Sequence, residues 1–329
     1  MQVAAFLEHR WIGQHSDARL NPSPPLMRQL VDHFMHAVVV IVKSSARPAA
    51  MSACGCLLAF TSVSAHAIES IDEPLLRLER VQHFYAQMAS AAQLDRPFLE
   101  VAEDRPRSAV RARGIEMAKD VYSVERAMAD IRSKMRAVSG ASPAAGTLPE
   151  IVTRIDNIDS FIDGKSFEEL QAIRQAWTKR YQARPDRRKI DAIIATMVAP
   201  DLAGETVVTA RRVKWVYETL IVERPARLDA IDAAELSAGI EVIMTRTRGP
   251  DHDGQPPLLR RDDTQRMWKE RRQVVLAQLP LEDVAKLHQI YAMSTARAKI
   301  NVLKAAFRSR NDADGLHFMT KMIGEGRTR

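Results

Sequence analysis

The sequence predicts an all-α protein, a multi-helix bundle that contains an antiparallel coiled-coil-like helical hairpin. Three observations support this fold class. Apolar residues recur at three- and four-residue spacing through most of the chain after Ile68, as they do on the buried face of a helix. Prolines fall between the periodic segments. Strand patterns do not alternate with helix patterns, which argues against a parallel α/β sheet.

The hairpin is predicted over residues 108–163, where the helical pattern is clearest. From Val110 to Val138 the apolar residues follow a 4-3 spacing for about four heptads, with charged residues between them. A turn-forming stretch follows at 139–147, and residues 148–162 then repeat the spacing. Because a short turn allows the two arms to pair, we expect an intramolecular seam; a dimerisation zipper is the alternative.

The other expected helices lie on both sides of this hairpin. Ser166 and Glu169 have the spacing of a capping box at the start of one of them. The polar insertion at 247–263 either divides residues 68–329 into two lobes or forms a mobile loop. The expected helices span residues 75–94, 166–182, 186–198, 205–223, 232–246, 262–278, 281–309 and 312–323.

Residues 42–67 have the three parts of a secretory signal peptide. Lys43 and Arg47 give a positive start, the apolar centre runs over 51–63, and an Ala-His-Ala sequence ends the segment at Ala67. We therefore expect a periplasmic or secreted protein that is cleaved near Ala67. An uncleaved membrane anchor and a lipoprotein are the alternatives, in that order.

Forty-one residues precede this segment, whereas a signal peptide should begin a protein. We interpret residues 1–41 as an upstream extension from a misplaced translation start, with Val42, Met35 and Met51 as candidate starts. A disordered or cytoplasmic tail is the alternative for the same residues.

Cysteine usage and charge are compatible with export. The two cysteines, Cys54 and Cys56, lie inside the proposed signal, so cleavage would leave residues 68–329 without a thiol. Residues 1–67 carry five of the 48 Lys and Arg and three of the 41 Asp and Glu, so residues 68–329 hold 43 cations and 38 acids. This modest excess favours anionic lipid, a cell-wall polymer or an acidic protein as a partner. Nucleic acid is disfavoured because the expected compartment lacks it.

No motif in the sequence specifies a catalytic, cofactor-binding or metal-ligating residue. Residues 163–166 resemble the end of a phosphate-binding loop, but Asp159 occupies the place of its first glycine. Asp251, His252 and Asp253 are candidate metal ligands, although three consecutive residues do not readily converge on one ion. A catalytic pair of distant carboxylates leaves no local signature.

Basic clusters on several expected helices suggest a patch for an anionic partner. One of these clusters, Arg187-Arg188-Lys189, lies outside the residues chosen for the candidate patch. The candidate patch comprises Arg211, Arg212, Lys214, Arg266, Lys269, Arg271 and Arg272.

Two classes of function follow from these observations. The first is a non-enzymatic binding or scaffold protein of the cell envelope, with a protein or cell-wall partner and membrane contact only through the signal segment. The second is an envelope enzyme such as a carboxylate-dependent glycan hydrolase. A weaker third reading is a cytoplasmic regulator whose signal-like segment is accidental.

Overall fold

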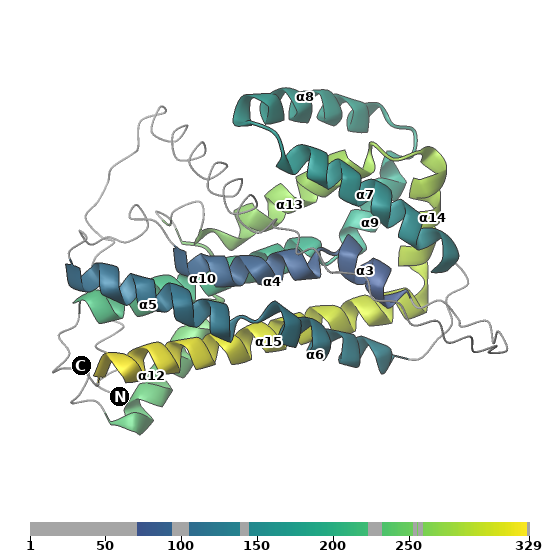
Figure 1. The fold of residues 1–329 in the computed structure, drawn as a ribbon. Helices are drawn as coiled ribbons and strands as arrows, with labels where there is room; N and C mark the ends of the chain where they lie inside the picture. The colour runs from purple at the N-terminus through teal and green to yellow at the C-terminus, as the bar shows by residue number, and fades with distance from the viewer. Residues whose placement is uncertain are drawn as a thin grey trace, which may run out of the picture.

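The computed structural model describes residues 71–93, 105–138, 145–222, 232–252, 255 and 259–327, and these residues form an all-helical bundle without strands (Figure 1). The predicted fold class is confirmed at this level. The proposed signal peptide at 42–67 and the segment 1–41 lie outside the described residues. The first half of the bundle contains α3 (Asp72–Leu78), α4 (Val81–Ser90), α5 (Arg105–Val121), α6 (Val124–Arg136), α7 (Leu148–Asp163), α8 (Phe167–Ala183) and α9 (Arg187–Thr196), with short 3-10 turns at Ala91–Gln93 and Ala145–Thr147. The second half contains α10 (Ala199–Val222), α12 (Ala233–Arg246), α13 (Arg261–Leu276), α14 (Leu281–Ala292) and α15 (Ser294–Arg327).

Two long helices, α10 and α15, form the centre of the bundle. They pack on each other. Helix α10 also packs against α13 and α4, and helix α15 packs against α6, α5 and α12. In Figure 1, α15 runs along α5 and α6 for most of the length of the molecule. Helix α10 buries Val213, Val216 and Tyr217 completely, so its many valines serve a helical core face, as the spacing predicted.

The expected helix at 75–94 is divided in two at Arg80. Arg80 adopts the left-handed conformation, with φ of 53°, and α3 ends two residues earlier. The Glu79 carboxylate accepts hydrogen bonds from the backbone N–H groups of Val198 (2.9 Å) and Ala199 (2.7 Å). Both N–H groups lie at the start of α10, where the backbone donors of a helix have no acceptor within the helix itself. The break therefore allows Glu79 to cap a second helix.

The single helix expected from Val110 to Val138 is wrong, because α5 ends at Val121 and α6 begins at Val124. Ser123 is extended, and its hydroxyl accepts a hydrogen bond from the Arg126 N–H (3.4 Å). The Arg126 side chain donates in turn to the Val121 carbonyl (3.0 Å) at the end of α5. A heptad count cannot detect such a break, because the apolar spacing continues through it.

The coiled-coil-like hairpin over residues 108–163 is not confirmed. Helix α6 packs chiefly against α15 and α4, whereas α7 packs against α3 and α13. The apolar seams of both helices are buried, but they contribute to a core shared by many helices. Spacing predicts which face is buried and does not specify the neighbour that covers it.

The C-terminal helices are also divided differently from the prediction. Met293 is extended and separates α14 from α15, and α15 then continues through residues 310–311 without interruption. Asn311 is fully buried within it, and its amide donates to the Glu205 carboxylate (2.9 Å). A polar residue that reads as a helix boundary is here a contact between α15 and α10.

The helices on the two sides of the 247–263 insertion share one core. Helix α12 packs on α15, α13 packs on α10, and α10 and α15 pack on each other. No single helix in the described ranges is long and apolar enough to cross a membrane; α9 and α10, bent by 44° where they meet, satisfy the length and composition test as a pair.

Candidate functional site

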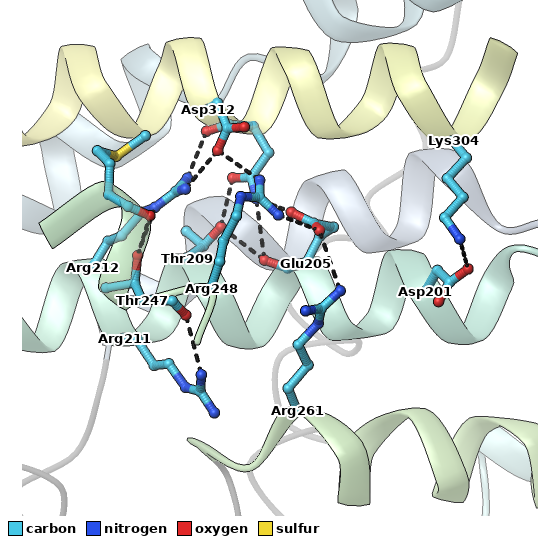
Figure 2. Close-up of polar contacts among 12 residues, drawn as sticks. Asp201, Glu205, Thr209, Arg211, Arg212, Thr247, Arg248, Arg261, Lys304 and Asp312 are labelled. Atoms are coloured by element: carbon cyan, nitrogen blue, oxygen red, sulfur yellow. Dashed lines mark hydrogen bonds and ion pairs between the residues drawn. The ribbon is translucent and has the colours of Figure 1, made fainter. Parts of the chain in front are cut away.

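A buried polar network joins α10, α15 and the turn after α12, and Arg248 lies at its centre (Figure 2). Arg248 donates to the Glu205 carboxylate and to the Asp312 carboxylate, both at 2.6 Å. Asn311 donates to Glu205, and the Thr209 hydroxyl donates to the Asn311 side-chain oxygen (2.8 Å). Glu205 is only 4% exposed, so its charge requires these partners.

Arg212 extends the same network and is completely buried. Its guanidinium donates to the Asn311 carbonyl (3.0 Å) and to the Asp312 carboxylate (2.6 Å). Burial would raise the pKa of Asp312, but the hydrogen bonds from Arg248 and Arg212 outweigh it and hold that pKa below its usual range. Gly315 leaves room for the guanidinium, since a Cβ there would lie 2.6 Å from Arg212 Nη1.

Arg211 fastens the insertion after α12 to α10. Its guanidinium donates to the carbonyls of Leu259 (2.8 Å), Thr247 (3.1 Å) and Gly249 (3.0 Å) and pairs with Asp251. Asp251 also accepts from the backbone N–H groups of residues 261 (2.8 Å) and 262 (2.9 Å), where α13 begins. Asp251 thus caps a helix from ten residues upstream.

A second buried cluster surrounds Asp159 of α7. Arg80 (3.2 Å), Arg271 (3.0 Å) and Arg272 (2.8 Å) all pair with this one carboxylate. The same three guanidinium groups lie 5.1–5.8 Å from the ring centre of Trp268. Burial would raise the pKa of Asp159, but the three arginines outweigh it and keep that pKa well below its usual range.

His83 lies at the edge of this cluster and stays neutral near neutral pH. Burial and the neighbouring charge of Arg80 lower its pKa to about 3. Its ring nitrogens contact the Arg80 guanidinium (3.3 Å) and the Gln87 amide (3.0 Å). The ring also packs edge-on against Trp268. These contacts make His83 part of the packing between α4 and α13.

Among the described residues, Glu79 is the carboxyl group whose pKa is raised. Burial raises the pKa of Glu79, against the hydrogen bonds from Tyr291 (2.6 Å) and from the backbone of Ala199 and Val198. A raised pKa is typical of a general acid, but such a group must also reach substrate. Glu79 is 0% exposed.

The seven residues of the predicted anionic-partner patch do not form one surface. Arg211, Arg212 and Arg272 are buried, and the partly buried Arg271 pairs with Asp159 and Asp163. The remaining three residues do not form a positive surface by themselves. Lys214 pairs with Glu218 and Arg266 pairs with Asp263, and only Lys269 is exposed without an ion pair to a described residue. The helices that carry them, α10 and α13, pack on each other, so most of these cations point into the protein.

The structure also bears on two local predictions, the capping box at Ser166 and the candidate metal ligands Asp251, His252 and Asp253. The capping box is confirmed: the Ser166 hydroxyl accepts from the Glu169 N–H (3.4 Å), and the Glu169 carboxylate accepts from the Ser166 N–H (2.8 Å). Asp253 lies outside the described residues. Within those residues, no three His, Cys, Asp or Glu side chains gather as a metal site would require.

A dense group of exposed cations lies where α8 ends and α9 begins. We refer to Lys179, Arg180, Arg187, Arg188 and Lys189 as the basic corner; all five are exposed. The side chains of four of them make neither an ion pair nor a hydrogen bond within the described ranges, while Arg187 lies over the Tyr181 ring and reaches Asp191 at 3.8 Å. In Figure 1, α8 lies at the edge of the bundle, outside α7 and α13.

The carboxylates nearest to the basic corner are occupied elsewhere. The Arg184 guanidinium donates two hydrogen bonds to the Asp186 carboxylate (2.7 and 2.8 Å). The Asp191 carboxylate accepts hydrogen bonds from the Tyr181 hydroxyl and from the Gln273 amide (3.1 Å). Arg184 also donates to two carbonyls of the turn between α13 and α14. The backbone of the corner is therefore fixed by Arg184, while four of its five outer cations have no carboxylate partner within the described residues.

The sequence itself contains a signal for the basic corner. Residues 179–189 contain six cations and one acid on both sides of Pro185. Three cations in the first turn of α9 also oppose the helix dipole, which favours acids at that position. A local conflict of this kind is a marker of function.

Comparisons of the chain with protein-family models, with curated proteins and with solved structures give no match.

Proposed function

We propose that this chain is an exported protein of the cell envelope that acts by binding, as a helical scaffold, and not by catalysis. The observation that carries this proposal is the basic corner. The charged residues of the interior are neutralised by one another and hold helices together, whereas the cations of the corner face solvent and only Arg187 among them makes an ion pair within the described residues. Exposed charge of one sign attracts a partner of the opposite sign.

Export is the other half of the proposal, and it is supported by the sequence of residues 42–67. A positive start, an apolar centre and small residues before the expected cleavage point are arranged as in secretory signals. Removal of this segment also removes both cysteines, so the remaining chain suits an oxidising compartment.

The glycan hydrolase considered from the sequence receives no specific support from the geometry. Such an enzyme needs an accessible acid with a raised pKa opposite a second carboxylate. Glu79 has the raised pKa but is enclosed by α10 and Tyr291. Glu205 and Asp312 share the Arg248 guanidinium, which neutralises them.

Export is tested by expressing the chain in a bacterial host from Val42 as the initiation site, so that the signal segment comes first, and by sequencing the N-terminus of the product. We expect a chain that begins at Ile68 and is found outside the cytoplasm. The substitution Ala67→Tyr should block cleavage, because the protease requires a small residue there, whereas His66→Tyr at the neighbouring position should be tolerated. A soluble cytosolic product that retains residues 42–67 would refute the export half.

Binding is tested with sedimented cell-envelope material and two charge-matched triple variants of the full chain. One carries Arg180→Gln, Arg188→Gln and Lys189→Gln in the basic corner. The control carries Lys119→Gln, Arg136→Gln and Arg308→Gln, three exposed cations on α5, α6 and α15 that make no ion pair within the described residues. We expect loss of binding in the first variant alone; equal binding by all three proteins contradicts the proposal.

A further inference from the structure

We propose that the basic corner binds the surface of a lipid bilayer that contains anionic phospholipids. This inference rests on the proposed function, since it names the envelope component that the corner contacts. Three features of the corner lead to it: the density of exposed cations, the open form of the depression beside it, and an exposed apolar side chain near it.

The cations supply the attraction. All five residues of the corner are exposed, and the neighbouring acids Asp186 and Asp191 are engaged by Arg184, Tyr181 and Gln273. Near an anionic bilayer each Lys or Arg contributes about 1 kcal/mol, which is about fivefold in affinity. The four cations of the corner that make no ion pair give a preference for an anionic over a neutral bilayer on the order of 1,000-fold.

The shape of the surface favours an extended partner over a small ligand. The depression beside the corner is lined by Arg174, Gln175, Thr178 and Lys179 and is open to solvent. An open surface cannot enclose a small anion, but it can lie against a sheet of headgroups. The position of α8 at the edge of the bundle leaves its outer side uncovered by the other described helices (Figure 1).

An exposed leucine adds an apolar contact to the same region. Arg184 binds the carbonyls of Ala277 (2.9 Å) and Leu279 (2.6 Å), so the chain between α8 and α9 sits on the turn that leads into α14. Leu281 follows that turn and is 54% exposed, more than the other large apolar side chains that face solvent in the described part of the chain. Cations beside an exposed apolar side chain are typical of peripheral membrane contact.

Vesicle sedimentation with the full chain tests this inference. The probes are vesicles of phosphatidylcholine alone and vesicles of phosphatidylcholine with about a third of phosphatidylglycerol. The proteins are the wild type, the corner triple variant and the control triple variant defined above. Because residues 42–67 are identical in all three, any contribution of that segment to binding cancels in the comparison.

We expect the wild type and the control variant to bind the anionic vesicles with similar affinity. The corner variant should bind them about 100-fold more weakly, which is about fivefold for each removed cation. Raising the salt concentration to 1 M should abolish the difference, since the Debye length falls to about 3 Å. Leu281→Ala should weaken binding by a smaller factor without changing its salt dependence.

Three outcomes overturn the inference: no preference of the wild type for anionic over neutral vesicles, an equal loss in both triple variants, and displacement from vesicles by soluble polyphosphate at an equal phosphate concentration. The last would assign the corner to a phosphate polymer. These failures differ from failure of the proposed function, because the corner variant would still lose binding to sedimented envelope material in the earlier experiment.

Discussion

Replacing Gly315 by alanine tests whether the Arg212 network holds α15 against α10. Gly324→Ala in the same helix is the matched control. A Cβ on Gly315 would lie 2.6 Å from Arg212 Nη1 and 3.1 Å from its Cδ, whereas a Cβ on Gly324 would meet no atom within 4 Å. Alanine is favoured over glycine in a helix by about 1 kcal/mol. Both substitutions should gain that amount, so the difference between them measures the clash.

The clash is costly because Arg212 cannot move without loss. Its side chain is completely buried, and its guanidinium donates to the Asn311 carbonyl and the Asp312 carboxylate. A hydrogen bond to a charged group contributes about 1.5–3 kcal/mol, and overpacking a core costs about 1–3 kcal/mol. A total cost of about 3 kcal/mol, set against the gain of about 1 kcal/mol, leaves Gly315→Ala less stable by about 2 kcal/mol.

Thermal unfolding followed by circular dichroism resolves these two effects. In a protein of this size, 1 kcal/mol changes the Tm by about 2–4 °C. Gly315→Ala should lower the Tm by about 4–8 °C, and Gly324→Ala should raise it by about 2–4 °C. If the two substitutions raise the Tm equally, Arg212 is not packed against α15 as described, and the reasoning about the network is wrong.

Three further predictions concern the caps and the buried charges. Ser166→Ala removes the capping box of α8 and should lower the free energy of unfolding by about 1 kcal/mol in a urea titration. Asp159→Asn leaves three arginines without their shared carboxylate and should cost about 3–5 kcal/mol. Because the pKa of Asp159 is held below its usual range, its contribution is present above about pH 4 and is lost as the pH falls; the variant should lack this acid-dependent part, and an unchanged pH profile of unfolding would contradict it. The pKa of His83 is lowered to about 3, so the protein should lose stability as the pH falls below about 6.5, by at most about 1.4 kcal/mol per pH unit, and His83→Gln should reduce this slope in urea titrations at pH 7 and pH 5.

The fold class and most helix positions could be predicted because both depend on local sequence. Apolar spacing marks a buried face, and prolines mark boundaries, wherever the helix ends up. The breaks at Arg80 and Ser123 could not be predicted from spacing, because each is fixed by contacts with a distant or non-apolar group. Glu79 binds the first turn of α10 about 120 residues away, and Arg126 caps α5 from the following helix.

The location of the exposed positive charge was harder to predict, since a cluster of arginines has the same appearance in sequence whether it is buried or exposed. Arg211 and Arg212 are adjacent on α10 and both turn inward, one to carbonyls of the insertion and the other to α15. Their partners Asp251 and Asp312 lie about 40 and 100 residues away. A pairing at that distance leaves no local pattern.

The basic corner differs from these interior clusters in a way that sequence does record. Arg271 and Arg272 lie on a helix whose buried face meets Asp159, so long-range acids neutralise them. Residues 187–189 occupy the first turn of α9, where the helix dipole repels cations, and the one acid between Lys179 and Lys189 is held by Arg184. Internal contacts account for only one of the three: Arg187 lies over the Tyr181 ring and reaches Asp191 at 3.8 Å, whereas the Arg188 and Lys189 side chains make no ion pair or hydrogen bond within the described residues. The unfavourable interaction with the helix dipole is offset if an external anion completes the charge balance, which is why the corner, and not the larger arginine content of the interior, carries the proposed function.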